Sequence, residues 1–319
     1  EERGAEVALL SVAAELVGMG NAVTVIGAGP PRDGAPYAYR QIAAVNRRKL
    51  ERLPRIPPFR SETAWEDASF AWNLLRAYQP RDFDIGVTCN FPFTHWALRR
   101  GGPRAPRHLF VTQNGDWPAR SDKAEFRLFR CDGLVCTNPD YEADNRVRWR
   151  TALIPNGIDP ARFAGVGGDR AGFNLPTDTP LVLMVSAFIE TKRVLDGMRA
   201  VAALPGIHFA VAGDGPLRAQ VEALAAEILP GRFTRLELPA ARMPVLYRSA
   251  DTFLHMSLTE SFGNVYVEAM ASGLPIVAHD SPRLRWIVGA RDTLCDTTDH
   301  AATVAALTRA LERGQGPAD

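Results

Sequence analysis

The chain has 319 residues and a mass of 34.9 kDa, which exceeds the usual single-domain size of roughly 100 to 200 residues and predicts two domains. Its 46% hydrophobic and 23% charged residues exclude collagen-like and largely disordered classes, and no run reaches the roughly 18 apolar residues that a membrane-spanning helix needs. A net charge of +1 disfavours a general nucleic-acid binder, and four cysteines without paired C-x-x-C spacing disfavour a zinc site.

Apolar, β-rich runs alternate with helical patterns along the chain, which is typical of parallel sheets with helical crossovers. The predicted strands are Asn21–Gly27, Phe83–Cys89, His108–Asn114 and Gly133–Asn138 in the first half, and Leu181–Phe188, Ile207–Gly213, Phe233–Leu238, Thr252–Ser257 and Pro275–His279 in the second. Turn and glycine-rich compositions at Pro155–Pro160 and Gly165–Gly168 separate the two series. The sequence therefore predicts two α/β domains, residues 1–165 and 166–319.

The first predicted element is a helix at Ala5–Val17, with no strand before it. Sheets of this class usually begin with a strand that feeds the first helix at the ligand crevice. We expect that an upstream strand of the native protein is absent from this chain.

The segment Thr259–Pro275 is the most informative stretch, because it spans a strand-to-helix turn and one helix. Gly263 allows the backbone to approach a ligand, and the helix that begins there offers unpaired N–H groups to an anion. Glu260 and Glu268 are placed to flank a diphosphate and accept hydrogen bonds from hydroxyl groups. The alternative is an ordinary helix, with Glu260 as its cap and Glu268 in solvent.

Two further segments follow strands of the second series. Lys192 and Arg193 come after the first of these strands, where a parallel sheet opens on its binding crevice, and both can neutralise phosphate. Gly213 lies in the turn Ala212–Pro216 at the end of the next strand. A solvated cation pair and a plain βα turn are the alternatives.

Together these segments resemble the retaining glycosyltransferases of family 4, which have the GT-B architecture of two facing Rossmann-like domains. The resemblance extends over nearly the whole chain. It rests on the E-x7-E segment Glu260–Glu268, the strand and loop Val185–Lys192, the turn Ala212–Pro216, the segment Ile154–Asp159 and the helix start Gly4–Glu6.

The resemblance implies that Glu260 binds hydroxyls of the donor sugar, Glu268 binds the ribose of the nucleotide, and Lys192 stabilises the leaving diphosphate. The backbone of Phe262, Gly263, Asn264 and Val265 would hold the sugar and the diphosphate, and Gly4 and Gly213 would line the substrate sites. Lys192 and the helix N-terminus would supply the charge that a metal supplies elsewhere, so neither a cofactor nor a divalent ion is expected.

The chain departs from the family pattern at two places. Ala187 stands where an arginine is usual five residues before the lysine, and Arg193 is the candidate substitute. Gln113 and Asn114 stand near a usual histidine position; we expect the Asn114–Asp116 loop to line the acceptor side, with Asp116 as a candidate base. Alternatively, the donor phosphate itself accepts the proton and no protein base is needed. His95 is a second acceptor-side candidate.

Residues 40–60 carry seven basic side chains and one acidic one, with apolar residues at helical spacing. An amphipathic helix of this kind can lie on an anionic membrane or receive a phosphorylated lipid acceptor. The alternative is a solvated helix packed on the sheet. We expect a cytoplasmic protein, held at the inner face of the membrane if the segment binds lipid.

The combined prediction is a metal-independent, retaining hexosyltransferase that uses a UDP- or GDP-sugar. The second domain would hold the donor and the first an acceptor, which the sequence leaves open between polysaccharide, lipid-linked sugar and small metabolite. A nucleotide-sugar epimerase of similar build and a non-catalytic partner subunit are the alternatives.

Overall fold

The computed structural model describes residues 4–89, 92–99, 102, 105–113, 129–290 and 293–314. The chain forms two compact units, Glu1–Asn156 and Gly157–Asp319. The break comes before the predicted boundary at residue 165, because Ile158 and Phe163 pack into the core of the second unit. Each unit is described by itself.

The second unit is built on one sheet of six parallel strands in the order β12-β11-β10-β7-β8-β9. All five predicted strands of this half are present, each somewhat shorter than predicted; β12 has two residues, too few for a sequence pattern. The strands are β7 Leu181–Val185, β8 His208–Ala212, β9 Phe233–Leu236, β10 Thr252–His255, β11 Ile276–His279 and β12 Leu294–Cys295.

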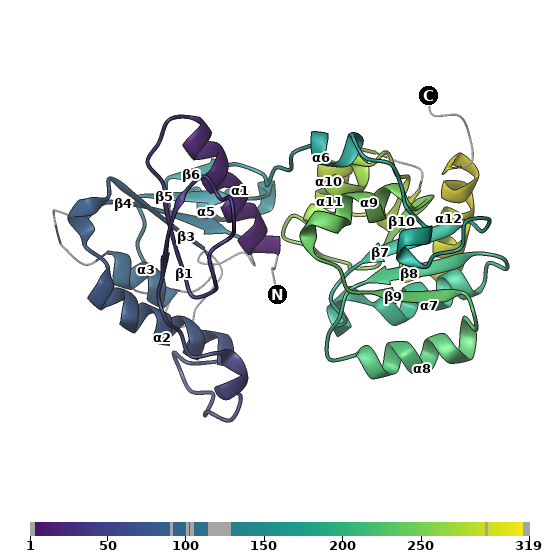
Figure 1. Cartoon of the computed structure of the whole chain (residues 1–319), viewed down its shortest axis with the longest axis horizontal. Helices are drawn as coiled ribbons and strands as arrows, with labels where there is room; N and C mark the ends of the chain where they lie inside the picture. The colour runs from purple at the N-terminus through teal and green to yellow at the C-terminus, as the bar shows by residue number, and fades with distance from the viewer. Residues whose placement is uncertain are drawn as a thin grey trace. The chain divides into compact units, whose positions relative to one another are not determined.

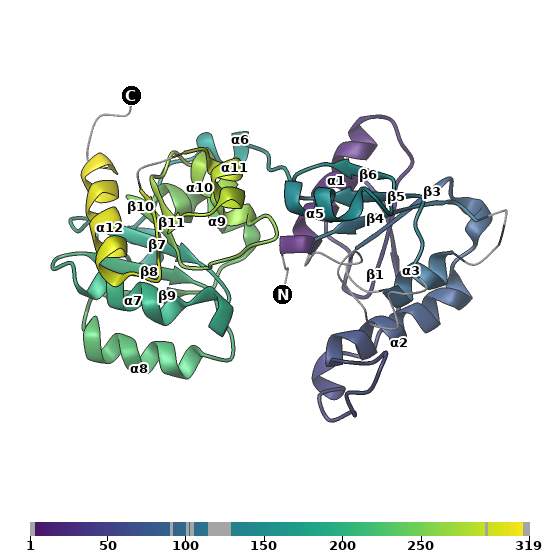
Figure 2. The ribbon, with the colours of Figure 1, turned by 180° about the vertical axis from the view of Figure 1, so that it is seen from behind.

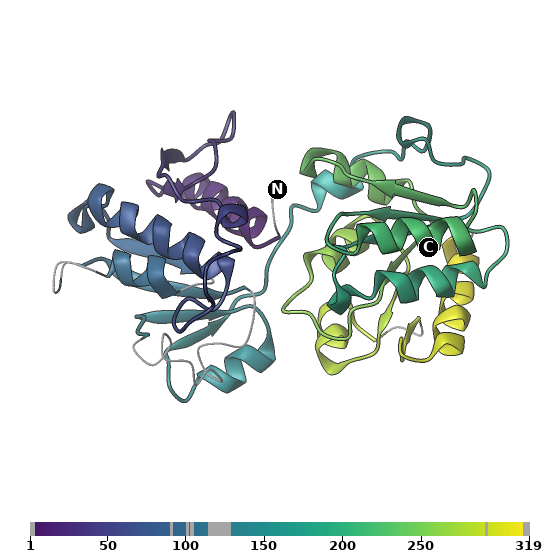
Figure 3. The same cartoon turned by 90° about the horizontal axis from the view of Figure 1, so that it is seen from below.

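Helices cover both faces of this sheet (Figures 1 and 2). Helices α7, α8 and α12 share one apolar core with the sheet, and α6, α9, α10 and α11 share the other. From below, α7 and α8 lie side by side (Figure 3). The helices are α6 Ala161–Ala164, α7 Val194–Ala202, α8 Arg218–Ile228, α9 Met243–Arg248, α10 Asn264–Ala271, α11 Pro282–Val288 and α12 His300–Gly314, with 3-10 turns η4 Ala171–Phe173, η5 Glu190–Lys192 and η6 Ala240–Arg242.

The first unit has a parallel pair, β1-β2, and a separate parallel sheet of order β3-β4-β5-β6. The four predicted strands correspond to β1, β3, β4 and β5. The elements are α1 Gly4–Gly18, β1 Thr24–Gly27, β2 Ala38–Gln41, η1 Arg47–Lys49, α2 Glu62–Ala77, η2 Pro80–Asp82, β3 Ile85–Cys89, α3 Pro92–Leu98, β4 Arg107–Thr112, β5 Gly133–Cys136, α5 Pro139–Asn145 and β6 Thr151–Leu153. The expected upstream strand stays a prediction.

The helix predicted within residues 40–60 is wrong. This segment ends β2, makes the single 3-10 turn η1 and then runs without helix to α2. Pro54, Pro57 and Pro58 lack the backbone N–H that a helix interior requires, so they exclude a helix interior over residues 54–58, while residues 40 and 41 belong to β2. No helix in the described part of the chain is long and apolar enough to span a membrane.

Candidate functional site

The candidate site lies at the point of the second sheet where the strand order reverses. Strands β7 and β10 are neighbours, but β7 leads to α7 on one face and β10 leads to α10 on the other. Crevices for ligands form at the carboxyl ends of the strands at such a switch point. Lys192 follows β7 and Glu260 follows β10, and the Lys192 ammonium forms an ion pair with Oε1 of Glu260.

The Glu260 carboxylate is held by the chain on several sides. His255, at the end of β10, lies with Nε2 3.0 Å from the same Oε1, and Arg283 donates from Nη1 to the Glu260 carbonyl oxygen at 2.7 Å. Burial alone would raise the pKa of Glu260, but the hydrogen bond from His255 and the positive charge of Lys192 lower it to about 2. Glu260 is therefore an anion at neutral pH, and its Oε2 has no partner among the described residues.

Helix α10 begins beside this carboxylate. Gly263 caps the helix at φ +78°, a left-handed conformation that favours glycine, and a Cβ there would come within 2.6 Å of the Tyr266 ring. The amides of the first helical turn point out of the helix at this end, which gives it a partial positive charge. The loop is fixed by Phe262, which is buried and packs edge-on against Trp286.

Glu268 lies farther along α10 and is partly buried. Its Oε2 accepts a hydrogen bond from the hydroxyl of buried Tyr247 at 2.7 Å. Burial raises the pKa of Glu268, and the Tyr247 hydroxyl and the charge of Arg162 only partly offset this effect. The two acids of the E-x7-E segment thus have opposite environments, since the pKa of Glu260 is lowered and that of Glu268 is raised.

Gly213 has a structural reason to be glycine. A Cβ at this position would overlap the carbonyl oxygen of Ser186, where the turn after β8 passes the loop after β7. The two turns are tied by the Phe188 N–H, which donates to the Asp214 carbonyl oxygen at 2.9 Å. Contact between Gly213 and a ligand stays a prediction.

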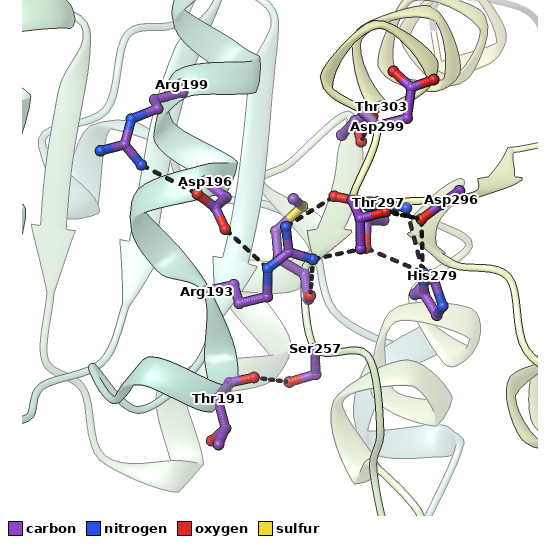
Figure 4. A network of polar contacts seen from close by, with 12 residues as sticks. Thr191, Arg193, Asp196, Arg199, Ser257, His279, Asp296, Thr297, Asp299 and Thr303 are labelled. Carbon is purple, nitrogen blue, oxygen red and sulfur yellow. Dashed lines mark hydrogen bonds and ion pairs between the residues drawn. The ribbon is translucent and has the colours of Figure 1, made fainter.

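Arg193 is committed to contacts within its own unit (Figure 4). Its guanidinium donates to Asp196 on α7, to the carbonyl oxygen of Met256 after β10, and to the side chain and carbonyl of Thr297 before α12. Four of its N–H groups are used in these bonds, which join the turn after β7 to two neighbouring loops. These contacts indicate that Arg193 stabilises the loops of its own unit. They do not favour the prediction that Arg193 takes over the role of the arginine that the family usually has at the position of Ala187.

The candidates of the first unit are only partly described. Asn114 and Asp116 lie outside the described residues, and Gly4 is the first residue of α1. The Gln113 side chain forms a reciprocal amide pair with Asn156, at 2.9 and 3.1 Å, which uses the groups expected to bind a hydroxyl. His95 is fully buried and its ring stacks on Phe129, so its suggested place on the acceptor side is wrong.

Sequence reasoning missed His255, Tyr247 and Arg283, which act on the two acids through hydrogen bonds. The position of His255 at a strand end, five residues before Glu260, was a usable signal. Tyr247 and Arg283 lie on helices distant in sequence and left no local pattern. In the described part of the chain, no three His, Cys, Asp or Glu side chains gather in a group that could hold a metal ion.

Comparison with protein families agrees with this geometry. A family model described as Glycosyltransferase Family 4 matches residues 3–162, and one described as Glycosyl transferases group 1 matches residues 168–318. The chain belongs to glycosyltransferase family 4. Together the two models match both units of the chain, including the first unit, for which the structure describes the fewest candidate site residues.

Curated relatives match about half of the chain. The lipopolysaccharide core biosynthesis glycosyltransferase LpsE of Rhizobium meliloti is 31% identical over 182 residues, covering 56% of this chain and 52% of LpsE. The D-inositol 3-phosphate glycosyltransferase of Mycolicibacterium smegmatis is 38% identical over 177 residues, covering 50% of this chain and 40% of that protein. The chain thus spans about half or less of the length of these relatives.

Solved structures show the GT-B fold over nearly the full chain. Sucrose-phosphate synthase of Thermosynechococcus elongatus superposes with a TM-score of 0.77 at 22% identity, covering 98% of this chain and 87% of that one. HepE of Anabaena, solved with UDP-glucose, gives a TM-score of 0.75 at 15% identity and covers 99% and 88%. The predicted α/β fold class is confirmed.

Proposed function

We propose that this protein transfers a hexose-type sugar from a UDP- or GDP-sugar to an acceptor hydroxyl, with retention at the anomeric carbon and without a metal ion. The observation that carries this proposal is the convergence of Lys192, Glu260 and the N-terminus of α10 at the switch point of the second sheet. The cation and the helix N-terminus can bind the diphosphate of a sugar nucleotide, and the ionised acid can accept a hydrogen bond from its sugar.

In the proposed reaction the bond between the anomeric carbon and the phosphate oxygen breaks, and its electron pair stays on the diphosphate. The Lys192 ammonium and the α10 amides stabilise this charge, while Oε2 of Glu260 accepts a hydrogen bond from a sugar hydroxyl. Glu268 would accept hydrogen bonds from the ribose. The acceptor oxygen forms the new bond on the same face, and its proton passes to the departing phosphate oxygen or to Asp116.

The names of relatives support the substrate class. HepE was solved with UDP-glucose, and the curated relatives are named for lipopolysaccharide core biosynthesis and for glycosylation of inositol 3-phosphate. These names favour a nucleotide-sugar donor and a hydroxyl acceptor in glycoconjugate synthesis.

The test incubates the protein with a panel of UDP- and GDP-hexoses and a set of glycan, lipid-linked and small hydroxyl acceptors. We expect donor-selective thermal stabilisation, transfer in the presence of EDTA, and by NMR a product with the anomeric configuration of the donor. Glu260→Gln should abolish transfer, whereas Glu227→Gln, at an exposed position of α8, should not. An epimerised donor, or no donor binding at all, would instead support the epimerase or the partner-subunit alternative.

Asp116 requires its own variant. If it is the base, Asp116→Asn should lower turnover at saturating donor. Unchanged turnover would leave the donor phosphate as the proton acceptor.

We also propose that residues 49–56 bind anionic membrane, and we place the protein at the inner face of the cytoplasmic membrane. Although the segment is no helix, Lys49, Arg52 and Arg55 are exposed beside Leu53 and Ile56, whose exposed fractions are 39% and 51%. Its base is anchored, since the Phe59 ring stacks on Trp65 with centroids 4.0 Å apart. Cations beside exposed apolar side chains match an anionic lipid surface.

Vesicle sedimentation tests this contact. Each cation removed, as in Arg52→Gln or Arg55→Gln, should weaken binding to phosphatidylglycerol vesicles by about 1 kcal/mol at low salt. Leu53→Ser should also weaken binding, whereas Val147→Ser, at a residue of the same unit that is 93% exposed, should not. Vesicle binding that does not change with salt concentration or in these variants would contradict the proposal.

A further inference from the structure

The imidazole of His255 is a buried polar group that contacts the candidate site. Its side chain is 2% exposed, and Nε2 lies 3.0 Å from Oε1 of Glu260. The ring lies nearly parallel to that of Phe253, with an angle of 11° between the planes, and edge-on to Tyr266. These two rings fix the direction in which Nε2 points.

The surroundings of His255 select one protonation state. Nδ1 is buried and has no hydrogen-bond partner among the described residues. A proton on Nδ1 would therefore be a buried donor without an acceptor, which costs free energy. Burial also lowers the pKa of His255, as does the charge of Lys192, while the hydrogen bond to Glu260 and the Glu260 charge act in the opposite direction. Because Nε2 faces a carboxylate oxygen and Nδ1 has no acceptor among the described residues, the geometry points to a proton on Nε2 that is donated to Glu260.

Lys192 and His255 both contact Oε1 of Glu260, but their side chains differ in how freely they can move. The Lys192 ammonium is the end of a flexible side chain, 24% exposed, whereas the His255 ring is fixed by packing. A diphosphate in the proposed site would compete with Glu260 for Lys192. When Lys192 moves to the phosphates, the Glu260 side chain retains His255, and its backbone retains Arg283.

We infer that His255 is a positioning residue, which keeps Glu260 ionised and aimed at the donor sugar after Lys192 has turned to the diphosphate. The inference rests on the proposed function and deepens it. His255 touches neither substrate nor reacting atoms, and it acts through one oxygen of Glu260. Among the described residues, the other ionisable groups that face this pair are Lys192 from η5, Tyr266 from α10 and Arg283 from α11.

The test compares His255→Phe, which keeps a ring without a donor, with His255→Gln, whose amide nitrogen can replace Nε2. At pH 7, kcat/KM for the sugar nucleotide should fall about 10- to 100-fold in His255→Phe, the range of a hydrogen bond to a charged group, and recover substantially in His255→Gln. Inhibition by UDP or GDP alone should be unchanged, because these molecules lack the sugar that Glu260 contacts. The acidic limb of the kcat/KM profile should move to higher pH only in His255→Phe.

The matched control is His208→Phe, a buried histidine of β8 bonded to Thr234, which should leave all these quantities unchanged. A measurement on the wild type does not depend on how the variants fold. In imidazole 15N spectra, His255 should be the neutral Nε2–H tautomer from pH 5 to pH 8, and an imidazolium or an Nδ1–H tautomer would overturn the inference.

Two failures remain distinguishable. If the wild type transfers sugar and His255→Phe is equally active with an unchanged pH profile, this inference alone is wrong. If the wild type transfers sugar from no donor and binds none, the proposed function is wrong.

Discussion

Replacing Glu260 with glutamine should destabilise the second unit in a pH-dependent way. The pKa of Glu260 is lowered from 4.5 to about 2 in the folded chain. At 1.36 kcal/mol for each pH unit, the ionised carboxylate stabilises the fold by about 3 kcal/mol at pH 7. Because the pKa is lower in the folded than in the unfolded state, this stabilisation is complete above the unfolded value of 4.5 and is lost as the pH falls toward 2.

Glu260→Gln should therefore lower the free energy of unfolding by about 1 to 3 kcal/mol at pH 7, the lower values applying because the amide oxygen still accepts a bond from His255. The difference from wild type should shrink to about 1 kcal/mol or less at pH 3. Hydrogen exchange of the β7 and β8 amides in urea reports this unit alone, since both strands lie in its core. Equal effects of Glu260→Gln and the exposed control Glu227→Gln at pH 7 would refute the reasoning.

Three other variants test separate contacts. Lys192→Met should lower kcat about 100- to 1000-fold, because it removes a charge that stabilises the leaving diphosphate. Steady-state kinetics would show this, with Arg218→Met, at an exposed position of α8, as the control, and an unchanged kcat would remove Lys192 from the mechanism. Gly213→Ala should cost about 1 to 3 kcal/mol of unfolding free energy from overlap with Ser186, whereas Gly167→Ala, with open space around it, should be neutral in the same exchange assay. Tyr247→Phe should raise the pKa of Glu268 further and weaken UDP binding by calorimetry as the pH is lowered; affinity equal to wild type from pH 5 to pH 8 would rule out this link.

Local sequence patterns predicted five of the six strands of the second unit and its E-x7-E segment. Its strands are short apolar runs between turn residues, and the E-x7-E segment has a glycine where the helix starts. Both features are local in sequence, and the strand order brings Lys192 and Glu260 together. Long-range contacts left no such pattern. Thr297, more than one hundred residues after Arg193, accepts hydrogen bonds from its guanidinium, and no local pattern indicated this contact.

The first unit was harder to predict for physical reasons. Apolar spacing in residues 40–60 suggested a helix, but the segment begins as the end of β2 and its last third contains three prolines. His95 resembled an acceptor-side residue because it lies near a strand end, and only the packing of Phe129 shows that it is buried. The short strands β2 and β6 carry too few apolar residues to stand out. Residue type alone could not indicate that Gln113 pairs with Asn156.

A crystal structure of the protein soaked with a UDP- or GDP-hexose addresses the central claim most directly. The account predicts a diphosphate at the start of α10, with the Lys192 ammonium moved from Glu260 to a phosphate oxygen and the Glu260 carboxylate on a sugar hydroxyl. A bound donor that leaves the Lys192–Glu260 ion pair intact, or that lies away from the ends of β7 and β10, would contradict it.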